Sequence, residues 1–366
     1  MSEAGRPWAT SAGAAISARG RVVIRSRVAA GYALGIPLLL ITLVVAASIG
    51  PVQIDPRNTA SIVLNHLHLA GLSGRVSGAE DVIIWQVRLP RVLTAGLVGA
   101  TLAASGASYQ AVFRNPLADP YLIGVAAGAA LGATTAIVSP LPLDFYNFGY
   151  LAAFAFVGAM LAVGLTYELA RVGRTIPPTA HILAGVAVSA AASAGTTLLM
   201  MLNESRVLVV FSWLYGDFTT SSWSKLWSIL PYVAAALLVL VMLGRRMNAL
   251  QLGEDEAKSL GLRVERLKAA IIITASLATA VCVAISGLIG FVGLIVPHVC
   301  RMLFGPDHRV LVPMSIIFGA TFLIGSDLGA RTVIAPQEIP VGILTAAIGA
   351  PFFLFLLRRQ RQGMNL

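Results

Sequence analysis

The sequence between Arg91 and Arg114 contains no charged residue. At about 1.5 Å of rise per helical residue, the roughly 22 residues between them cover about 33 Å, which matches the hydrocarbon core of a bilayer. Small residues fill this stretch instead of the Leu and Ile expected of a lipid-facing helix, so its backbone can approach other helices closely. They are Ala95, Gly96, Gly99, Ala100, Ala103, Ala104, Gly106 and Ala107. The stretch therefore predicts a transmembrane helix inside a bundle.

The composition places the whole chain among polytopic membrane proteins. Of its 366 residues, 57% are hydrophobic and 11% are charged, and the mean hydropathy is +0.83. The 26 Lys and Arg residues exceed the 16 Asp and Glu residues, but they are scattered through short loops beside apolar segments. This pattern indicates membrane topology and argues against nucleic-acid binding. Cys282 and Cys300 lie in or beside apolar segments without metal-ligand spacing, so we expect packed free thiols.

Ten apolar segments predict an all-α polytopic membrane protein with about ten transmembrane helices. The expected spans are residues 31–49, 91–114, 121–138, 150–170, 179–202, 226–244, 269–285, 287–303, 310–324 and 341–357. The two segments beside Ser286 could also form one broken segment. The predicted organisation is an N-terminal tail at 1–29, a transmembrane domain at 30–359 with an outer loop at 50–87, and a C-terminal tail at 360–366.

The distribution of positive charge predicts that both termini are cytoplasmic. Ten spans with an internal N-terminal tail place all but seven of the Lys and Arg residues on the inner side, as the positive-inside rule requires. The outward residues are Arg57, Arg75, Arg88, Arg91, Arg206, Lys225 and Arg331. A transit or signal peptide would give a similar N-terminus, but residues 31–49 are long for a signal sequence, which favours a retained first helix.

Two classes of transport function differ in their source of energy. An ion-coupled carrier usually holds an ionisable group inside the membrane. We find none at mid-depth, because Glu168 lies one turn from Arg171 and Asp327 lies near an outer helix end. The sequence also lacks hydrolase motifs and a phosphate-binding P-loop, since none of its three lysines follows a glycine. We therefore predict that energy comes from another polypeptide, with an ion-coupled secondary transporter as the alternative.

The longest inner segment, residues 245–268, has the composition of a short surface helix. The acidic residues Glu254, Asp255 and Glu256 open a helix-forming stretch that ends before Gly261. A solvated linker helix and a contact for a partner protein are both compatible with this composition.

A set of short motifs occurs in a fixed order along residues 85–359, and together they resemble permeases of the type II ABC importers for ferric siderophores, haem and cobalamin. One such motif would be weak, but their number and order make the resemblance specific. The motifs are Arg88-Leu-Pro-Arg91, Ser105-Gly106 with Gln110, Asn115-Pro-Leu-Ala-Asp-Pro120, Leu122-Ile-Gly124 with Gly128-Ala129, Leu183-Ala-Gly185, Leu252-Gly-Glu254, Leu260-Gly261, the stretch from Gly287 to Leu294, Pro297-His298 with Arg301, Asp307-His-Arg309, Asp327 with Ala330-Arg331, and Ile339-Pro-Val-Gly342 with Gly349-Ala-Pro351.

The resemblance implies a permease subunit of the bacterial cytoplasmic (inner) membrane that passes a large metal chelate, namely a ferric siderophore, haem or a corrinoid, into the cytoplasm. It implies a homodimer around a central pathway, two ATP-binding subunits beneath it, and a periplasmic or lipid-anchored substrate-binding protein outside. The chain would be no enzyme and would bind no cofactor or metal, because ATP and Mg belong to the ATP-binding subunits. The expected pathway lining is Ala184, Gly185, Ala187, Ser189, Ala191, Ala192 and Gly195.

The resemblance also assigns three groups of site residues. The external arginines would meet acidic residues of the binding protein, and the coupling segment would fit a groove on the ATP-binding subunit, with its acidic trio facing basic groups there. The docking residues are Arg88, Arg91 and Arg331, the cytoplasmic gate residues are Asn115, Leu117 and Thr179, and the coupling residues are Leu252, Gly253, Glu254, Asp255, Glu256, Leu260 and Gly261.

Two further positions need separate interpretation. Pro178 departs from the small hydroxylic residue that is familiar at its position in the family, so we assign the second gate element to Thr179 alone. His66 and His68 in the outer loop could present both imidazoles on one side of an extended segment. Because no third ligand is in view, we expect ordinary loop residues in preference to metal or haem ligands.

Overall fold

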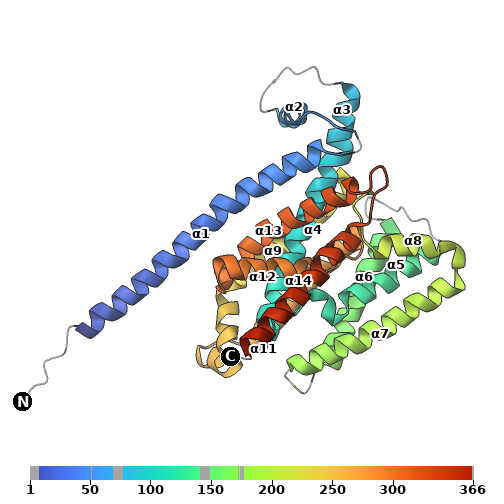
Figure 1. Cartoon of the computed structure of the whole chain (residues 1–366). Coiled ribbons are helices and arrows are strands. Elements are labelled where there is room, and N and C mark those ends of the chain that lie inside the picture. The colour runs from blue at the N-terminus through green and yellow to red at the C-terminus, as the bar shows by residue number, and fades with distance from the viewer. Residues whose placement is uncertain are drawn as a thin grey trace, which may run out of the picture.

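The structure is a computed structural model that describes residues 8–50, 52–68, 77–140, 149–171, 173 and 177–364. Within these residues, ten long helices form an all-helical bundle (Figure 1), which confirms the predicted fold class. They are α1 (Trp8–Ser48), α4 (Leu89–Phe113), α5 (Val125–Val138), α6 (Gly149–Leu169), α7 (Pro178–Leu202), α9 (Trp223–Leu252), α11 (Val264–Ser286), α12 (Val292–Phe304), α13 (His308–Thr332) and α14 (Val341–Met364).

Most of these helices have the length and composition of a membrane span. Seven described helices are long and apolar enough to cross a bilayer, and three shorter apolar helices complete the set of ten. In α1 the apolar span begins at Val28, although the helix itself begins at Trp8, so backbone that we predicted as a tail is helical. At the other end of the chain, α14 continues to Met364, beyond the predicted boundary at residue 359.

The bundle is organised around α4, as its small residues predicted. In the continuous helix from Gly78 to Phe113, 89% of the most apolar stretch is buried. Helix α4 packs against α9, α11, α12 and α13. In the contact with α13, two glycines bring the helix backbones against each other. A Cβ atom on Gly99 would lie 2.3 Å from the Gly319 carbonyl oxygen, and a Cβ on Gly319 would lie 2.4 Å from the Gly99 carbonyl oxygen. Only glycine therefore fits at this pair of positions.

The outer segment at 50–87 differs from the long mixed loop that we predicted. Its described residues contain α2 (Pro56–His66), α3 (Gly78–Val82) and η1 (Ile83–Arg88), and the last two continue directly into α4. Helix-start signals account for both α2 and α3. Asp55 caps a helix with proline at its first position, and Ser77 forms a capping box with Glu80. Ile54, Ile62 and Ile84 form a small separate core beneath them.

The apolar sequence around Ser286 forms two helices. Helix α11 ends at Ser286, Gly287 has a φ of 68°, and α12 begins at Val292 after Phe291, which also has a positive φ of 69°. The remaining short elements connect longer helices. They are η2 (Pro120–Ile123), η3 (Glu204–Arg206), α8 (Val207–Leu214) and α10 (Glu254–Ser259).

The bundle has two distinct ends. In Figure 1, the start of α1 and the end of α14 lie at one end, whereas α2 and α3 lie at the other, which agrees with both termini on one side of the membrane. Helix α9 connects these ends: Trp223 in its first turn donates a hydrogen bond to the Trp85 carbonyl oxygen (2.7 Å), and α10 follows its last residue, Leu252. Over 30 residues, about 45 Å separate the two.

Candidate functional site

At the outer end, two arginines hold the C-terminus of α1. The last carbonyl groups of a helix have no intrahelical donor. Arg88 Nη1 donates hydrogen bonds to the carbonyl oxygens of Ala47 (3.0 Å) and Ser48 (2.6 Å), and Arg331 Nη2 donates one to Ala46 (3.0 Å). Positive charge is also favourable at the negative end of the helix dipole. The two arginines therefore fasten α1 to the rest of the bundle.

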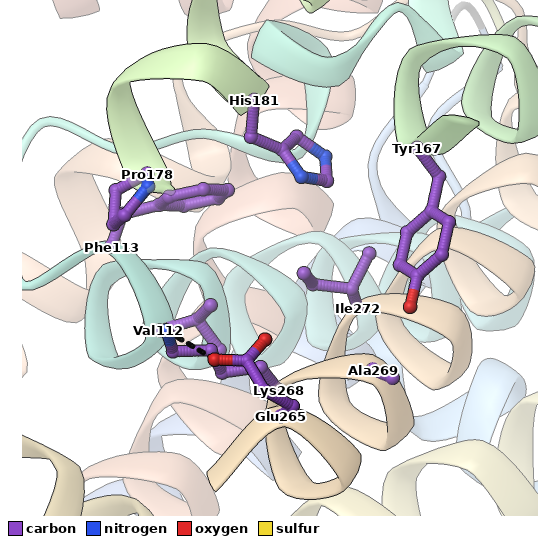
Figure 2. A pocket seen from close by; sticks show the side chains of 9 residues that line it. All are labelled: Val112, Phe113, Tyr167, Pro178, His181, Glu265, Lys268, Ala269 and Ile272. Carbon is purple, nitrogen blue, oxygen red and sulfur yellow. Dashed lines mark ion pairs between the residues drawn. The ribbon is translucent and has the colours of Figure 1, made fainter. Parts of the chain in front are cut away.

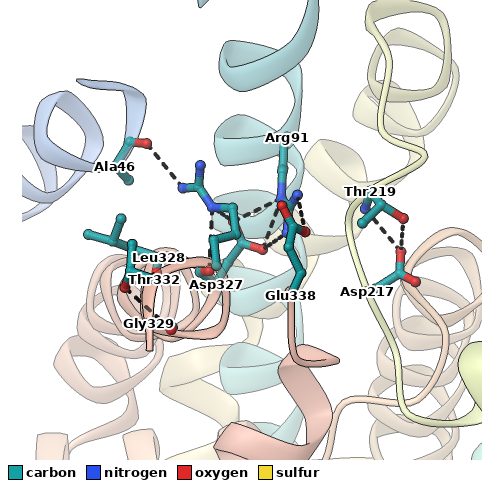
Figure 3. A network of polar contacts seen from close by, with 10 residues as sticks. Ala46, Arg91, Asp217, Thr219, Asp327, Leu328, Gly329, Thr332 and Glu338 are labelled. Carbon is teal, nitrogen blue, oxygen red and sulfur yellow. Dashed lines mark hydrogen bonds and ion pairs between the residues drawn. The ribbon is translucent and has the colours of Figure 1, made fainter. Parts of the chain in front are cut away.

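The third predicted docking residue belongs to an ion-pair network that Figure 3 shows between α4, α13 and the following loop. Arg91 donates to Asp327 Oδ1 from Nε (3.1 Å) and Nη2 (2.9 Å), and from Nη1 to Glu338 Oε2 (2.8 Å). Arg331 Nε lies 3.1 Å from the other oxygen of Asp327. Asp327 thus bridges two guanidinium groups, and with Glu338 it balances their charge, as charges inside an apolar bundle require.

The structure brings Arg88, Arg91 and Arg331 together at the outer end, but it does not expose them. Their side chains are turned inward, and the residues are 5%, 9% and 3% exposed. Within the described chain, only Glu338 of their acidic partners reaches solvent, with its side chain 30% exposed against 1% for Asp327. The docking role stays a prediction, and in this conformation the three arginines bind their own chain.

The two outer histidines make local contacts. His66 Nε2 lies 3.0 Å from Asp81 Oδ1, and its ring stacks on Trp85 at a centroid distance of 4.0 Å. His68 Nδ1 lies 3.2 Å from the carbonyl oxygen of His66. No group of three or more His, Cys, Asp and Glu side chains that could hold a metal ion occurs among the described residues. These contacts stabilise the outer helices α2 and α3 against η1.

At the inner end, the predicted gate residues flank the ends of two helices. Helix α4 ends at Phe113, Arg114 adopts a left-handed conformation with φ 47°, and Asn115 Oδ1 accepts a hydrogen bond from the Leu117 N–H (2.9 Å). This turn leaves the Leu117 side chain half exposed. Thr179 is exposed in the first turn of α7.

The proline that departs from the family pattern also has a clear position. Pro178 is the first residue of α7, where a missing N–H costs nothing because no helical partner exists for it. Its side chain lines a pocket between four helix ends (Figure 2). The pocket residues are Val112 and Phe113 of α4, Tyr167 of α6, Pro178 and His181 of α7, and Glu265, Lys268, Ala269 and Ile272 of α11. Sequence reasoning did not identify Tyr167, His181 or Lys268 as members of one site, because they lie far apart in the chain.

The coupling segment forms a helix with well-defined ends. Helix α10 follows Gly253, which has a φ of 135°, and ends in a Schellman motif at Gly261, which has a φ of 81°. In that motif, the Leu262 N–H donates to the Ala257 carbonyl (3.1 Å) and the Gly261 N–H donates to the Lys258 carbonyl (2.8 Å). Both glycines occupy backbone conformations that side chains disfavour.

The surface of α10 is apolar at its edges and acidic between them. Leu252 and Leu260 flank the helix and are 66% and 63% exposed. They lie beside the exposed charges of Asp255 and Glu256. Asp255 is exposed and accepts a hydrogen bond from Lys258 Nζ (3.0 Å), which raises the pKa of Lys258.

The acidic trio of the coupling segment is divided. Glu254 turns toward the bundle, where its Oε1 lies 2.5 Å from Nζ of the buried Lys268, whereas Asp255 and Glu256 remain exposed. Glu254 is thus paired within its own chain, and the contact of the three carboxylates with a partner stays a prediction. Sequence reasoning missed this pair because Lys268 was assigned to topology alone.

The expected pathway helix presents only part of its predicted lining. Ala187 and Ala191 are exposed on α7, together with Ala190, Ser193 and Ala194. In contrast, Gly185 and Ala192 are buried, and a Cβ on Gly185 would meet the Leu122 carbonyl oxygen at 2.1 Å. They pack toward α5 and η2 and so belong to the bundle interior.

Comparisons with known proteins agree with this architecture. Residues 38–359 match the family model of the FecCD transport family. The ABC transporter permease YvrB of Bacillus subtilis is 37% identical over 94% of this chain and 97% of its own length. The cobalamin import permease BtuC of Halobacterium salinarum is 39% identical over 88% of this chain and 94% of its own.

A solved structure has the same fold. It is an inward-facing ABC transporter assigned to the metal-chelate type, with a TM-score of 0.77 and 35% sequence identity over 89% of this chain and 97% of that chain. The described bundle, its motifs and these matches agree over nearly the whole length. The chain therefore belongs to the FecCD transport family and is a non-catalytic, multi-pass permease subunit of a type II ABC importer in the cytoplasmic membrane.

Proposed function

We propose that this permease passes a large metal chelate into the cytoplasm, driven by ATP-binding subunits that contact α10 and supplied by a substrate-binding protein at the outer end. The observation that carries the proposal is the separation of these two surfaces. The exposed side chains of Leu252 and Leu260 lie at one end of α9. The ion-pair network of Arg91, Arg331 and Asp327 lies at the other end. A partner that pulls on α10 thus acts on the side opposite to cargo delivery.

The substrate class rests on relatives and on the character of the bundle. Relatives are described as permeases for cobalamin, hemin, iron(3+)-hydroxamate and Fe(3+) dicitrate. The exposed residues of α7 combine small side chains, such as Ala187 and Ala191, with aliphatic ones, such as Leu183, and carry no charge. A pathway without strong ligands suits a bulky cargo that must not be retained. We assign the pathway to a homodimer, in which two such faces would enclose it.

One relative suggests a different cargo. The molybdate permease MolB of Haemophilus influenzae is 37% identical over 90% of this chain and 95% of its own length. A small oxyanion is therefore the second candidate substrate. Uptake assays with ferric hydroxamate, hemin, cobalamin and molybdate, run in parallel, separate these cargo classes.

The decisive experiment is uptake into proteoliposomes that contain the permease with candidate ATP-binding and substrate-binding proteins encoded beside it. We expect uptake only with ATP and both partners, and no ATP hydrolysis by the permease alone. Uptake that a proton or sodium gradient drives without nucleotide would contradict the proposal and support an ion-coupled secondary transporter. Size analysis of the purified permease tests the homodimer.

A further inference from the structure

The pocket between α4, α6, α7 and α11 contains an imidazole without a partner. His181 is 1% exposed, and neither ring nitrogen has a hydrogen-bond partner among the described residues. Its ring makes edge-on contacts with Phe113 (centroid distance 5.5 Å) and Tyr167 (6.3 Å). Leaving a buried polar group unpaired costs about 1 to 3 kcal/mol, so an arrangement of α7 that gives His181 a partner would be favoured.

A partner for His181 lines the same pocket. Figure 2 shows Glu265 and Lys268 on α11, facing the space into which His181 points. Lys268 Nζ lies 2.5 Å from Glu254 of α10 but 3.6 Å from Glu265, which is beyond hydrogen-bond distance. Lys268 therefore binds the coupling helix tightly and Glu265 loosely. Glu265 is the acid that can change partners.

The first turn of α7 carries His181 and borders the pocket. It begins at Pro178 with Pro177 as the preceding cap residue, and no side chain caps its N-terminus. Thr179, the predicted gate residue, belongs to this same turn. A change at Glu265 can thus alter the position of the gate.

We propose that Glu265 exchanges between Lys268 and His181 and that this exchange links α10 to the inner gate. When an ATP-binding subunit moves α10, Lys268 follows Glu254 and leaves Glu265. Glu265 then accepts a hydrogen bond from His181, and the pocket closes as the first turn of α7 moves toward α11. Lys268 acts here as a positioning residue. The inference rests on the proposed function, since it assumes that α10 receives the motion of an ATPase.

The proposal predicts an effect opposite to that of ordinary destabilisation. In the purified permease alone, Lys268→Met frees Glu265 to bind His181 permanently, so amide hydrogen exchange in residues 178–184 should slow by about tenfold. Loss of a merely structural ion pair would speed exchange instead. The double variant Lys268→Met with Glu265→Met, which removes the acceptor for His181, should return exchange to the wild-type rate or faster. Arg266→Met, which removes an exposed charge from the same turn of α11, is the matched control.

A second measurement covers the case in which Lys268→Met does not fold. Cysteines introduced together as Pro178→Cys and Ala269→Cys, which line the same pocket and leave His181 and Glu265 in place, should form a disulfide faster in the ATP-driven complex than without nucleotide. The native Cys282 and Cys300 are buried and should not compete. Faster or unchanged exchange in Lys268→Met overturns the proposal, as does a disulfide rate that ATP does not change.

Failure of the proposed function and failure of the Glu265 exchange give different results. If slowed exchange occurs but no ATP-binding subunit drives uptake by the wild type, the proposed function fails while the exchange of Glu265 stands. If ATP drives uptake and Lys268→Met behaves like Arg266→Met in both uptake and hydrogen exchange, the exchange of Glu265 fails while the proposed function stands. Lys268→Met should reduce uptake. Lys268→Arg, which keeps the charge, should retain at least half of the uptake that is lost in Lys268→Met.

Discussion

Asp327 shows how a transmembrane bundle tolerates buried charge. The carboxylate is 1% exposed and contacts both Arg91 and Arg331, and Arg331 in turn binds the end of α1. The network therefore joins α1, α4 and α13 through one side chain. Sequence reasoning placed Asp327 and the arginines at the same end, but it could not pair them, because 236 residues separate Arg91 from Asp327.

Replacing Asp327 by Asn should be the most damaging change in this network. It leaves two buried guanidinium groups with one formal partner between them, which costs about 3 to 5 kcal/mol. Glu338→Gln removes a carboxylate that is 30% exposed and should cost less than about 1 kcal/mol. Thermal unfolding of the purified permease in detergent, followed through its tryptophans, measures both. Equal losses in the two variants would contradict a central role for Asp327.

At the inner end, the carboxyl group of Asp119 makes the stability of the folded protein depend on pH. Burial raises the pKa of its carboxyl group to about 6, although a hydrogen bond from the Tyr121 N–H opposes the shift. A raised acid pKa means that the folded state prefers the protonated form, so stability falls as pH rises from about 4 to 6 and stays reduced above that. Asp119→Asn keeps the acceptor for Tyr121 and removes this loss, which amounts to at most about 3 kcal/mol.

The measurement for Asp119→Asn is the melting temperature at two pH values. The variant should melt higher than the wild type at pH 7.5, and the difference should shrink markedly at pH 5.0. A constant difference between pH 5.0 and pH 7.5 would show that the Asp119 carboxyl group does not titrate in this range.

At the level of elements, hydropathy found the ten helices but placed several ends too early. Helix α9 continues through Arg245 to Leu252, and α13 continues past Ile324 to Thr332. Charged residues mark the end of an apolar segment, not the end of a helix, when they reach water or a partner charge. The outer helices were missed because their capping signals lie in polar sequence, which we interpreted as loop.

Helix α10 offers a test of element geometry. Gly261 ends the helix with a φ of 81°, and its added Cβ would meet no atom within 4 Å, so only backbone strain opposes a side chain there. Gly261→Ala should therefore cost about 1 kcal/mol and loosen the helix end. We expect faster hydrogen exchange in residues 254–262 and uptake reduced by a factor of about two to ten. Ser259→Ala, on the exposed surface of the same helix, is the control and should leave uptake unchanged.

For the whole molecule, the two polar ends of the bundle differ in the contacts that hold their helices. At the outer end, ion pairs and arginine–carbonyl hydrogen bonds join α1, α4 and α13. The inner end contains a pocket, the His181 imidazole, which has no hydrogen-bond partner among the described residues, and the exposed leucines beside α10. The small residues of α4 predicted the packed centre, but the asymmetry between the ends depends on pairs that sequence spacing does not reveal.

This asymmetry predicts that variants at the two ends affect different partners. Leu252→Ser with Leu260→Ser removes the exposed apolar side chains beside α10, so co-purification of the ATP-binding subunit and uptake should both fall at least tenfold.

Arg91→Ala changes only the outer ion-pair network, so uptake should fall while the ATP-binding subunit still co-purifies. Its co-purification also shows that the variant folds. Binding of the substrate-binding protein to wild type should weaken as salt is raised from 0.05 to 0.5 M, since the screening length of charge contacts falls from about 14 Å to about 4 Å over this range. Loss of the ATP-binding subunit from the Arg91 variant, or its retention after both leucine changes, would show that the two surfaces do not act separately.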